Sequence, residues 1–262
     1  MRNKLYNLGD SWAWGYDDDF ETPFKTTYAD IIAKNFGLKK VNCCKPGWAL
    51  ANATESFIKK VVPHLKENDC VLVTIPPDTR IAVACATGGR NTRTVFSESA
   101  LWKELVRETG LNPYQFELTL NKDLLLIASI CKLKKAKYAF QHNYSSFTYD
   151  PTWEMSWITD NYIDINKSML NILGIPDIVY KGISLQEQLD KKQDGPKRNN
   201  ELEDNDIRAQ GSNQDFDKIL DLFYRLMTRS FHPNLTGHRM LGDEFTHRLR
   251  QIWDMQPTNG IN

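Results

Sequence analysis

The sequence has no long apolar run, no excess of positive or negative charge, and no pair of cysteines spaced like metal ligands. Of its 262 residues, 33 are Lys or Arg and 33 are Asp or Glu, so the formal net charge is zero. That balance offers no electrostatic basis for binding nucleic acid or an anionic membrane. No segment approaches the roughly 18–20 apolar residues of a membrane span, and the start of the chain, MRNKLYNLGDSWAWG, has no apolar core of signal-peptide length. We expect a cytoplasmic protein with no nucleic-acid partner and no membrane partner.

Cysteine is also scarce, and its spacing does not suit a metal site. The 5 cysteines are scattered along the chain, at Cys43, Cys44, Cys70, Cys85 and Cys131. An odd number with this spacing is typical of buried free thiols in a reducing compartment. The first two are adjacent on an expected strand, so their side chains should point to opposite faces of the sheet. We expect no bound metal and no cofactor.

Short apolar segments alternate with helical patterns over the first two-thirds of the chain. The expected strands are Lys4–Leu8, Leu38–Cys44, Cys70–Ile75, Lys137–Gln141 and a short Asp177–Tyr180. The expected helices are Thr27–Phe36, Ala53–Leu65, Ser97–Thr109, Tyr114–Leu133 and Ile158–Leu173. This alternation predicts an α/β fold, a three-layer α/β/α arrangement around a doubly wound, mostly parallel sheet. Active sites of such sheets lie beyond the carboxyl ends of the strands, where Ser11, Gly47 and Pro77 all fall.

A polar segment from Gln186 to Asp215 interrupts this pattern. It contains almost no apolar residues, so it cannot bury enough surface to order itself. We expect a flexible surface insertion at about 186–215 within one domain covering 1–262, with a substrate-gating lid as the alternative. A helical pattern resumes over Phe216–Arg229.

The first cluster with chemical potential is Gly9-Asp10-Ser11, directly after the first strand. A serine hydroxyl becomes a useful nucleophile only when a base takes its proton. A tight turn at a strand end exposes such a hydroxyl, and it leaves backbone N–H groups free to bind an oxyanion. Taken alone, this tripeptide is a common turn composition.

Two further clusters follow the second strand and precede the last helix. Gly47 can present its N–H where a side chain would obstruct, although taken alone this cluster is better explained as a plain β-to-α turn. Asn52, with Glu55 three residues later, has the pattern of a helix cap for Ala53–Leu65. His232 precedes a proline, which favours an extended backbone, and a loop histidine is a suitable general base. A second histidine, His238, is expected to be structural and hydrogen-bonded, and Thr236 is expected to cap the helix that follows.

The order of these clusters resembles the SGNH/GDSL hydrolase family. The elements that carry the resemblance are LGDSWAWG, PGWA and FHPNLTGHRML, and they span Lys4 to Leu249. By this resemblance Ser11 would be the nucleophile, His232 the base, and the N–H groups of Ser11 and Gly47 oxyanion donors. The family hydrolyses esters, thioesters or acyl groups on lipids and sugars without a metal. The segment Thr74-Ile-Pro-Pro-Asp-Thr-Arg80 is also similar to divergent SGNH-like proteins of large-genome phages, which would imply a virion or host-cytoplasm location.

Two positions depart from the family pattern. Pro77 stands where the family has the asparagine that completes the oxyanion hole, and proline cannot donate a hydrogen bond. Losing one such donor typically costs about 10²–10³ in rate. Asn52 or Thr74 could substitute, although Asn52 is better explained as a cap. Arg229 stands where the family has the aspartate that orients the histidine, so either a Ser-His dyad or a distant aspartate remains open.

These observations favour a serine-dependent ester hydrolase acting on an acetylated sugar or another small ester. The alternative is a catalytically impaired SGNH fold that binds a glycan or a protein, and a third option is acyl transfer to an acceptor other than water. Nothing in the sequence indicates an oligomeric state. Further residues expected near the substrate are Asp10, Arg80 and a cluster of the tryptophans Trp12, Trp14 and Trp48, whose rings either stack on sugars or pack over the sheet.

Overall fold

A computed structural model describes residues 2–15, 24–76, 80–84, 90–94, 113–143, 156–175, 218, 221–223, 225–228 and 232–255. At its centre lies a four-stranded sheet in the order β2-β1-β3-β6. Its strands are β1 (Lys4–Leu8), β2 (Lys39–Asn42), β3 (Cys70–Ile75) and β6 (Lys137–His142). Every pairing in this sheet is parallel, which confirms the expected sheet, and β1 and β3 have the predicted bounds.

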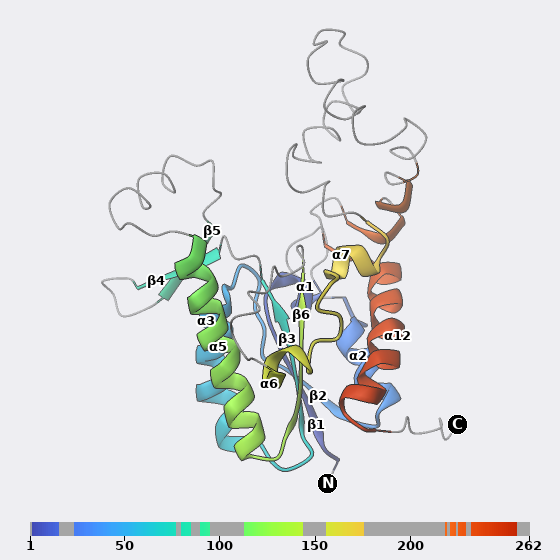
Figure 1. Cartoon of the computed structure of the whole chain (residues 1–262). Helices are drawn as coiled ribbons and strands as arrows, with labels where there is room; N and C mark the ends of the chain where they lie inside the picture. The colour runs from blue at the N-terminus through green and yellow to red at the C-terminus, as the bar shows by residue number, and fades with distance from the viewer. Residues whose placement is uncertain are drawn as a thin grey trace, which may run out of the picture.

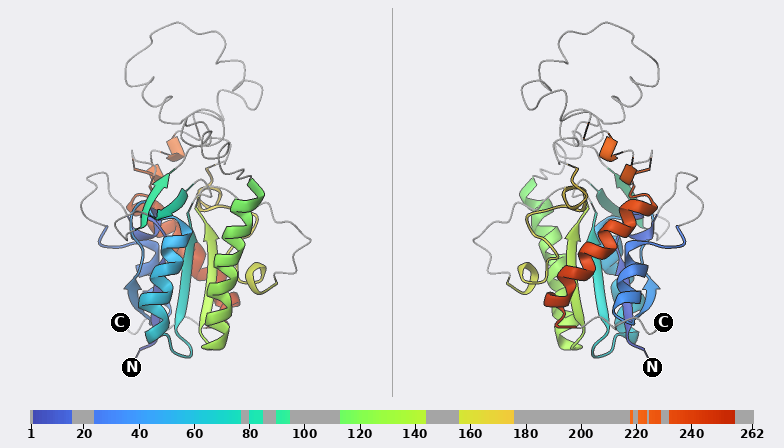
Figure 2. Two further views of the ribbon diagram at one scale, coloured as in Figure 1. Left: turned by 90° about the vertical axis from the view of Figure 1, so that its left-hand side faces the viewer. Right: turned by 90° about the vertical axis from the view of Figure 1, so that its right-hand side faces the viewer.

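Helices cover both faces of the sheet, so the fold is the expected three-layer α/β/α class (Figures 1 and 2). One face packs against α3 (Leu50–Ser56) and α5 (Pro113–Leu133). The other packs against α2 (Tyr28–Asn35) and α12 (Leu235–Ile252). Every residue of β3 is buried, as expected for a central strand covered on both faces.

The cysteines behave as the sequence predicts. Cys43 and Cys44 follow β2, which ends earlier than expected, yet they contribute to the two opposite cores. The described cysteines are free and buried, namely Cys43, Cys44, Cys70 and Cys131. Cys85 lies outside the described residues.

The helix expected at Ala53–Leu65 begins earlier and does not stay α-helical. It starts at Leu50, then continues as a π-helical turn over Phe57–Val61 and a 3₁₀ turn over Val62–His64. The change of helix type has a local cause, because Pro63 lacks the N–H that an α-helical hydrogen bond needs. Asn52 is therefore not the N-cap. It lies inside the first turn, and its Oδ1 accepts a hydrogen bond from the backbone N–H of the true N-cap, Ala49 (3.1 Å).

The single helix expected at Ile158–Leu173 is wrong. The structure has two short helices, α6 (Ser156–Thr159) and α7 (Met169–Ile172), with an irregular segment between them. The reason is a tertiary contact: Tyr162 forms a parallel bridge with Phe140 of β6, so the chain there continues the sheet instead of coiling. An antiparallel hairpin of β4 (Arg80–Ala84) and β5 (Arg90–Thr94) was not expected either.

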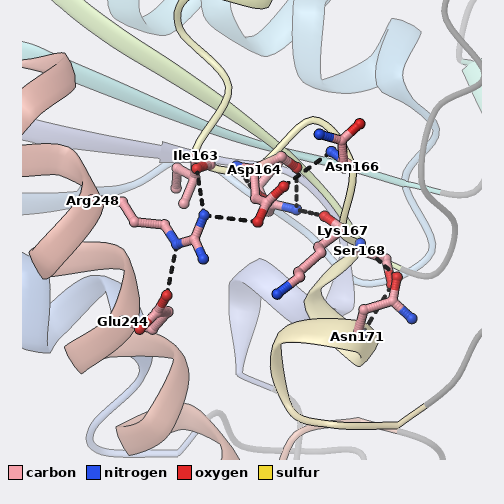
Figure 3. A network of polar contacts seen from close by, with 9 residues as sticks. Ile163, Asp164, Asn166, Lys167, Ser168, Asn171, Glu244 and Arg248 are labelled. Atoms are coloured by element: carbon pink, nitrogen blue, oxygen red, sulfur yellow. Dashed lines mark hydrogen bonds and ion pairs between the residues drawn. The ribbon is translucent and has the colours of Figure 1, made fainter.

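The segment between these helices is fixed to β6 by hydrogen bonds and to α12 by an ion pair, which Figure 3 shows at Arg248. Gln141 Oε1 of β6 accepts a hydrogen bond from the backbone N–H of Asp164 (2.9 Å). Arg248 of α12 contacts the Asp164 carboxylate at 2.7 Å and the Glu244 carboxylate at 2.6 Å. These contacts tie the helix that follows His232 to the strand at the far side of the sheet.

Other expectations concern residues outside the described ranges: Ser97–Thr109, Asp177–Tyr180, the 186–215 insertion, Pro77 and Arg229. Within the described ranges, no helix has the length and apolar character needed to cross a membrane.

Candidate active site

A tight turn joins β1 to the short helix α1 (Ser11–Trp14) at the carboxyl edge of the sheet (Figure 1). Gly9 has φ of +145°, and a Cβ on it would lie 2.7 Å from the carbonyl oxygen of Thr74. Only glycine allows this close approach of the turn to β3. Asp10 then caps α1, because its Oδ1 accepts a hydrogen bond from the backbone N–H of Trp12 (3.0 Å).

Ser11 and His232 meet in this turn although 221 positions separate them in the sequence. The Oγ of Ser11 lies 2.7 Å from Nε2 of His232, and both side chains are buried. A nucleophile and base must lie within hydrogen-bond reach, roughly 2.6–3.2 Å between heavy atoms. When Nε2 carries no proton it can accept the Ser11 hydroxyl proton, which is the tautomer a general base requires.

The His232 backbone is held from two directions. Its carbonyl accepts a hydrogen bond from the backbone N–H of Thr228 (2.7 Å), and its own N–H donates to Thr228 Oγ1 (3.2 Å). Next to it, Met227 and Pro233 form an antiparallel bridge. The imidazole therefore projects from a fixed backbone.

Helix α12 begins directly after this segment, and its N-cap is Asn234 instead of the expected Thr236. The Asn234 Oδ1 accepts hydrogen bonds from the N–H groups of Thr236 (2.9 Å) and Gly237 (3.0 Å). Asparagine is among the best N-cap residues, which explains why the helix starts there. A Cβ on Gly237 would lie 2.3 Å from the carbonyl oxygen of Leu226, so glycine lets the helix lie against the segment that leads to His232.

His238 is not the hydrogen-bonded histidine that the sequence suggested. It is fully buried, and neither ring nitrogen has a hydrogen-bond partner. Its ring lies 5.6 Å from the ring of Tyr28 and 5.7 Å from that of Phe24, centroid to centroid. Burial lowers the pKa of His238 to about 3, so the ring is neutral at physiological pH.

The loop after β2 lies beside the serine turn. The backbone N–H of Lys45 donates to the carbonyl of Gly9 (3.4 Å), and Gly47 follows with φ of +76°. Gly47 is exposed. The N–H of Ser11 belongs to the first turn of α1, where no intrahelical acceptor exists. The two expected oxyanion donors thus lie on adjacent segments, Ser11 at the start of α1 and Gly47 on the loop after β2.

The three tryptophans do not form the expected cluster. Trp12 is fully buried, and it packs with Trp14 on the α2/α12 side of the sheet. Trp48 packs against the opposite core. The chain leaves β1 toward one face and β2 toward the other, which separates the rings. Asp10 is also fully buried, as a cap beneath the turn, and only the backbone of Arg80 is described.

One residue at this edge was missed from sequence. Asn143 follows β6 directly and is fully buried, and its Nδ2 donates to Asp10 Oδ1 at 2.9 Å. The available signal was its place: a polar residue just beyond a strand of the same parallel sheet as β1. The partner could not be read, because 133 positions separate the two residues.

No family model and no curated protein matches the sequence. Among solved structures, the chain is similar to a lipase/acylhydrolase from Enterococcus faecalis, with 11% identity, a TM-score of 0.46, and 99% of this chain and 100% of that chain covered. It is also similar to a catalytic mutant of an acetylxylan esterase from Geobacillus stearothermophilus, with 14% identity, a TM-score of 0.44 and 94% of each chain covered. Identity and TM-score are both low, so these similarities assign no function to the chain.

Proposed function

We propose that this protein is a serine-dependent ester hydrolase of the SGNH/GDSL type, with Ser11 as nucleophile and His232 as general base. The observation that carries the proposal is the 2.7 Å contact between Ser11 Oγ and His232 Nε2. It joins the two residues that the family resemblance singles out, at the sheet edge where α/β folds place their catalytic groups.

The proposed chemistry proceeds through an acyl-enzyme. His232 Nε2 takes the hydroxyl proton as Ser11 Oγ attacks the ester carbonyl. The N–H groups of Ser11 and Gly47 stabilise the oxyanion of the tetrahedral intermediate. The imidazolium then gives its proton to the leaving alcohol, and a water molecule releases the acid by the same steps.

We propose a small-molecule or carbohydrate ester, such as an acetylated sugar, as the substrate. Trp14 in α1 and Trp48 in the loop after β2 are both partly exposed, and they lie on opposite sides of the edge that carries Ser11. The alternative of a glycan-binding module without chemistry is less well supported, because it does not account for the contact between Ser11 Oγ and His232 Nε2.

The test combines a fluorophosphonate probe with hydrolysis of p-nitrophenyl acetate. The purified protein should be labelled at Ser11, and both labelling and hydrolysis should be lost in Ser11→Ala and in His232→Ala. Matched controls are Ser129→Ala on α5 and His247→Ala on the exposed side of α12, which should both stay active. A wild-type protein that is neither labelled nor faster than Ser11→Ala would exclude the proposal.

A further inference from the structure

The backbone of Asn143 and one half of its side-chain amide are hydrogen-bonded at the carboxyl edge of the sheet. Its N–H donates to the carbonyl of Ile75 (3.2 Å), and its carbonyl accepts from the N–H of Leu170 (3.3 Å). Its Nδ2 donates to Asp10 Oδ1 (2.9 Å). The residue therefore connects the end of β6 with the serine turn after β1, across β3.

The other half of this amide is unusual. Asn143 Oδ1 is buried and has no hydrogen-bond partner, and the residue is fully buried. A buried polar atom without a partner costs stability and requires an explanation. The paired half supplies one, because the amide N–H donates a hydrogen bond to the Asp10 carboxyl oxygen without bringing a charge into the buried site.

Asp10 transmits this contact to Ser11. The same Oδ1 accepts from the N–H of Trp12 (3.0 Å), and the Asp10 carbonyl accepts from the N–H of Trp14 (2.9 Å). In the sequence Ser11 stands between Asp10 and these two donors. The orientation of the Asp10 side chain therefore sets the direction of the first turn of α1. That turn carries both the Ser11 hydroxyl and the Ser11 N–H.

We propose that Asn143 is a positioning residue for Ser11, acting through the Asp10 carboxylate. The inference rests on the proposed function, because it assigns Asn143 to the same reaction. Asn143 touches neither substrate nor the reacting atoms in this scheme. It fixes the carboxylate that caps α1, and the cap holds Ser11 Oγ at His232.

The first experiment compares Asn143→Ala and Asn143→Asp with the wild-type protein and with Asn166→Ala, an exposed asparagine on the segment after β6. A misplacement of about 1 Å at a reacting group can cost on the order of 10²-fold in rate. We expect kcat for p-nitrophenyl acetate to fall by about that factor in both variants, with KM within about threefold, because substrate binding is left intact. Full kcat in either variant, folded by circular dichroism, would overturn the proposal.

The second experiment is a double-mutant cycle of Asp10→Ala, Asn143→Ala and the two together. Asn143 Nδ2 and the Trp12 N–H donate to the same Asp10 Oδ1, so removing the carboxylate removes the contact through which Asn143 acts. We expect kcat of the double variant to lie within about threefold of that of Asp10→Ala, because a residue that acts through Asp10 has no further effect without it. A double variant slower than Asp10→Ala by about the factor lost in Asn143→Ala would overturn the proposal. If Asn143→Ala does not fold, Asn143→Ser takes its place in the cycle.

A third measurement separates this proposal from the proposed function. The ¹⁵N and ¹H imidazole signals of His232 report its contact with Ser11 without any turnover. If Asn143 positions Ser11, these signals in Asn143→Ala should move toward those in Ser11→Ala, and signals unchanged from wild type would refute the inference. If fluorophosphonate does not label the wild-type protein, the proposed hydrolase function is wrong. The His232 signals still show whether Asn143 positions Ser11.

Discussion

Two buried histidines lie close to the start of α12, His232 before the helix and His238 within it, and their hydrogen-bonding surroundings differ. His232 has a hydroxyl at 2.7 Å and a backbone held by Thr228. His238 has no hydrogen-bond partner at either ring nitrogen, and it fills space beside Tyr28 and Phe24. Histidine thus has a hydroxyl partner at position 232 and only packing contacts at position 238.

Burial alone therefore does not identify a functional histidine. His232 lies on a non-helical segment whose backbone bonds aim the ring at the serine turn. His238 lies in the first turns of α12, and its direction follows the helix toward the core. A neutral, unpaired ring there behaves as an aromatic filler with a polar penalty.

The largest expected difference between the two is in activity. His232→Ala should lower kcat/KM for p-nitrophenyl acetate by about 10³-fold or more, because the base is removed. His238→Leu should change it by less than about threefold, because no ring nitrogen of His238 takes part. Steady-state kinetics on both variants at one pH make the comparison. Equal losses in the two would mean that the contrast in surroundings has no catalytic meaning.

Gly237 offers a way to disturb His232 through the helix. In Gly237→Ala the added Cβ would meet the carbonyl oxygen of Leu226 at 2.3 Å, so α12 or the segment before His232 must shift. We expect a loss of about 10²-fold in kcat and about 1–3 kcal/mol in the free energy of unfolding.

The matched control for Gly237→Ala is Gly242→Ala on the same helix. There the added Cβ would crowd the side chain of Ile31 at 2.8 Å, away from the segment that carries His232. Urea unfolding should show a comparable loss of stability in both, with kcat preserved only in Gly242→Ala. A preserved kcat in Gly237→Ala would mean that its close approach does not position the base.

His238 should also make the free energy of unfolding depend on pH. The pKa of His238 is about 3 in the folded protein against 6.5 for a free histidine, so the unfolded state binds more protons below about pH 6.5. Protonation of His238 therefore does not change the free energy of unfolding above about pH 6.5, and it lowers that free energy as the pH falls toward 3. His142, whose pKa burial lowers to about 4, acts in the same direction.

Removing His238 should make this acid dependence shallower. In His238→Leu, the fall in unfolding free energy below about pH 6 should be smaller than in the wild type by up to about 1.4 kcal/mol per pH unit. Urea titrations between about pH 7 and pH 4.5 measure the slope. Identical slopes in the two proteins would show that folding does not lower the pKa of His238.

The sequence predicts part of this site, and the remainder depends on tertiary packing. The apolar run of β3 and the alternation of strands and helices predicted the parallel sheet, and the order of motifs predicted that Ser11 and His232 meet. Local pattern could not show that Tyr162 bridges to Phe140, because that pairing is tertiary and overrides helical periodicity. The unpaired state of His238 and the bond from Asn143 to Asp10 likewise depend on which distant elements pack together.

The smallest expected effect is the stability of His238→Leu at neutral pH. Leucine is close to histidine in volume, and it removes buried polar nitrogens that have no partner, a change worth about 1–3 kcal/mol. It also removes the ring contacts with Tyr28 and Phe24, worth about 0.5–1.5 kcal/mol. The relief exceeds the loss, so the free energy of unfolding should rise by about 1 kcal/mol, measured by urea unfolding at pH 7.5. A fall of similar size would show that the His238 nitrogens are hydrogen-bonded in solution, and the contrast with His232 would then lie in the partner alone.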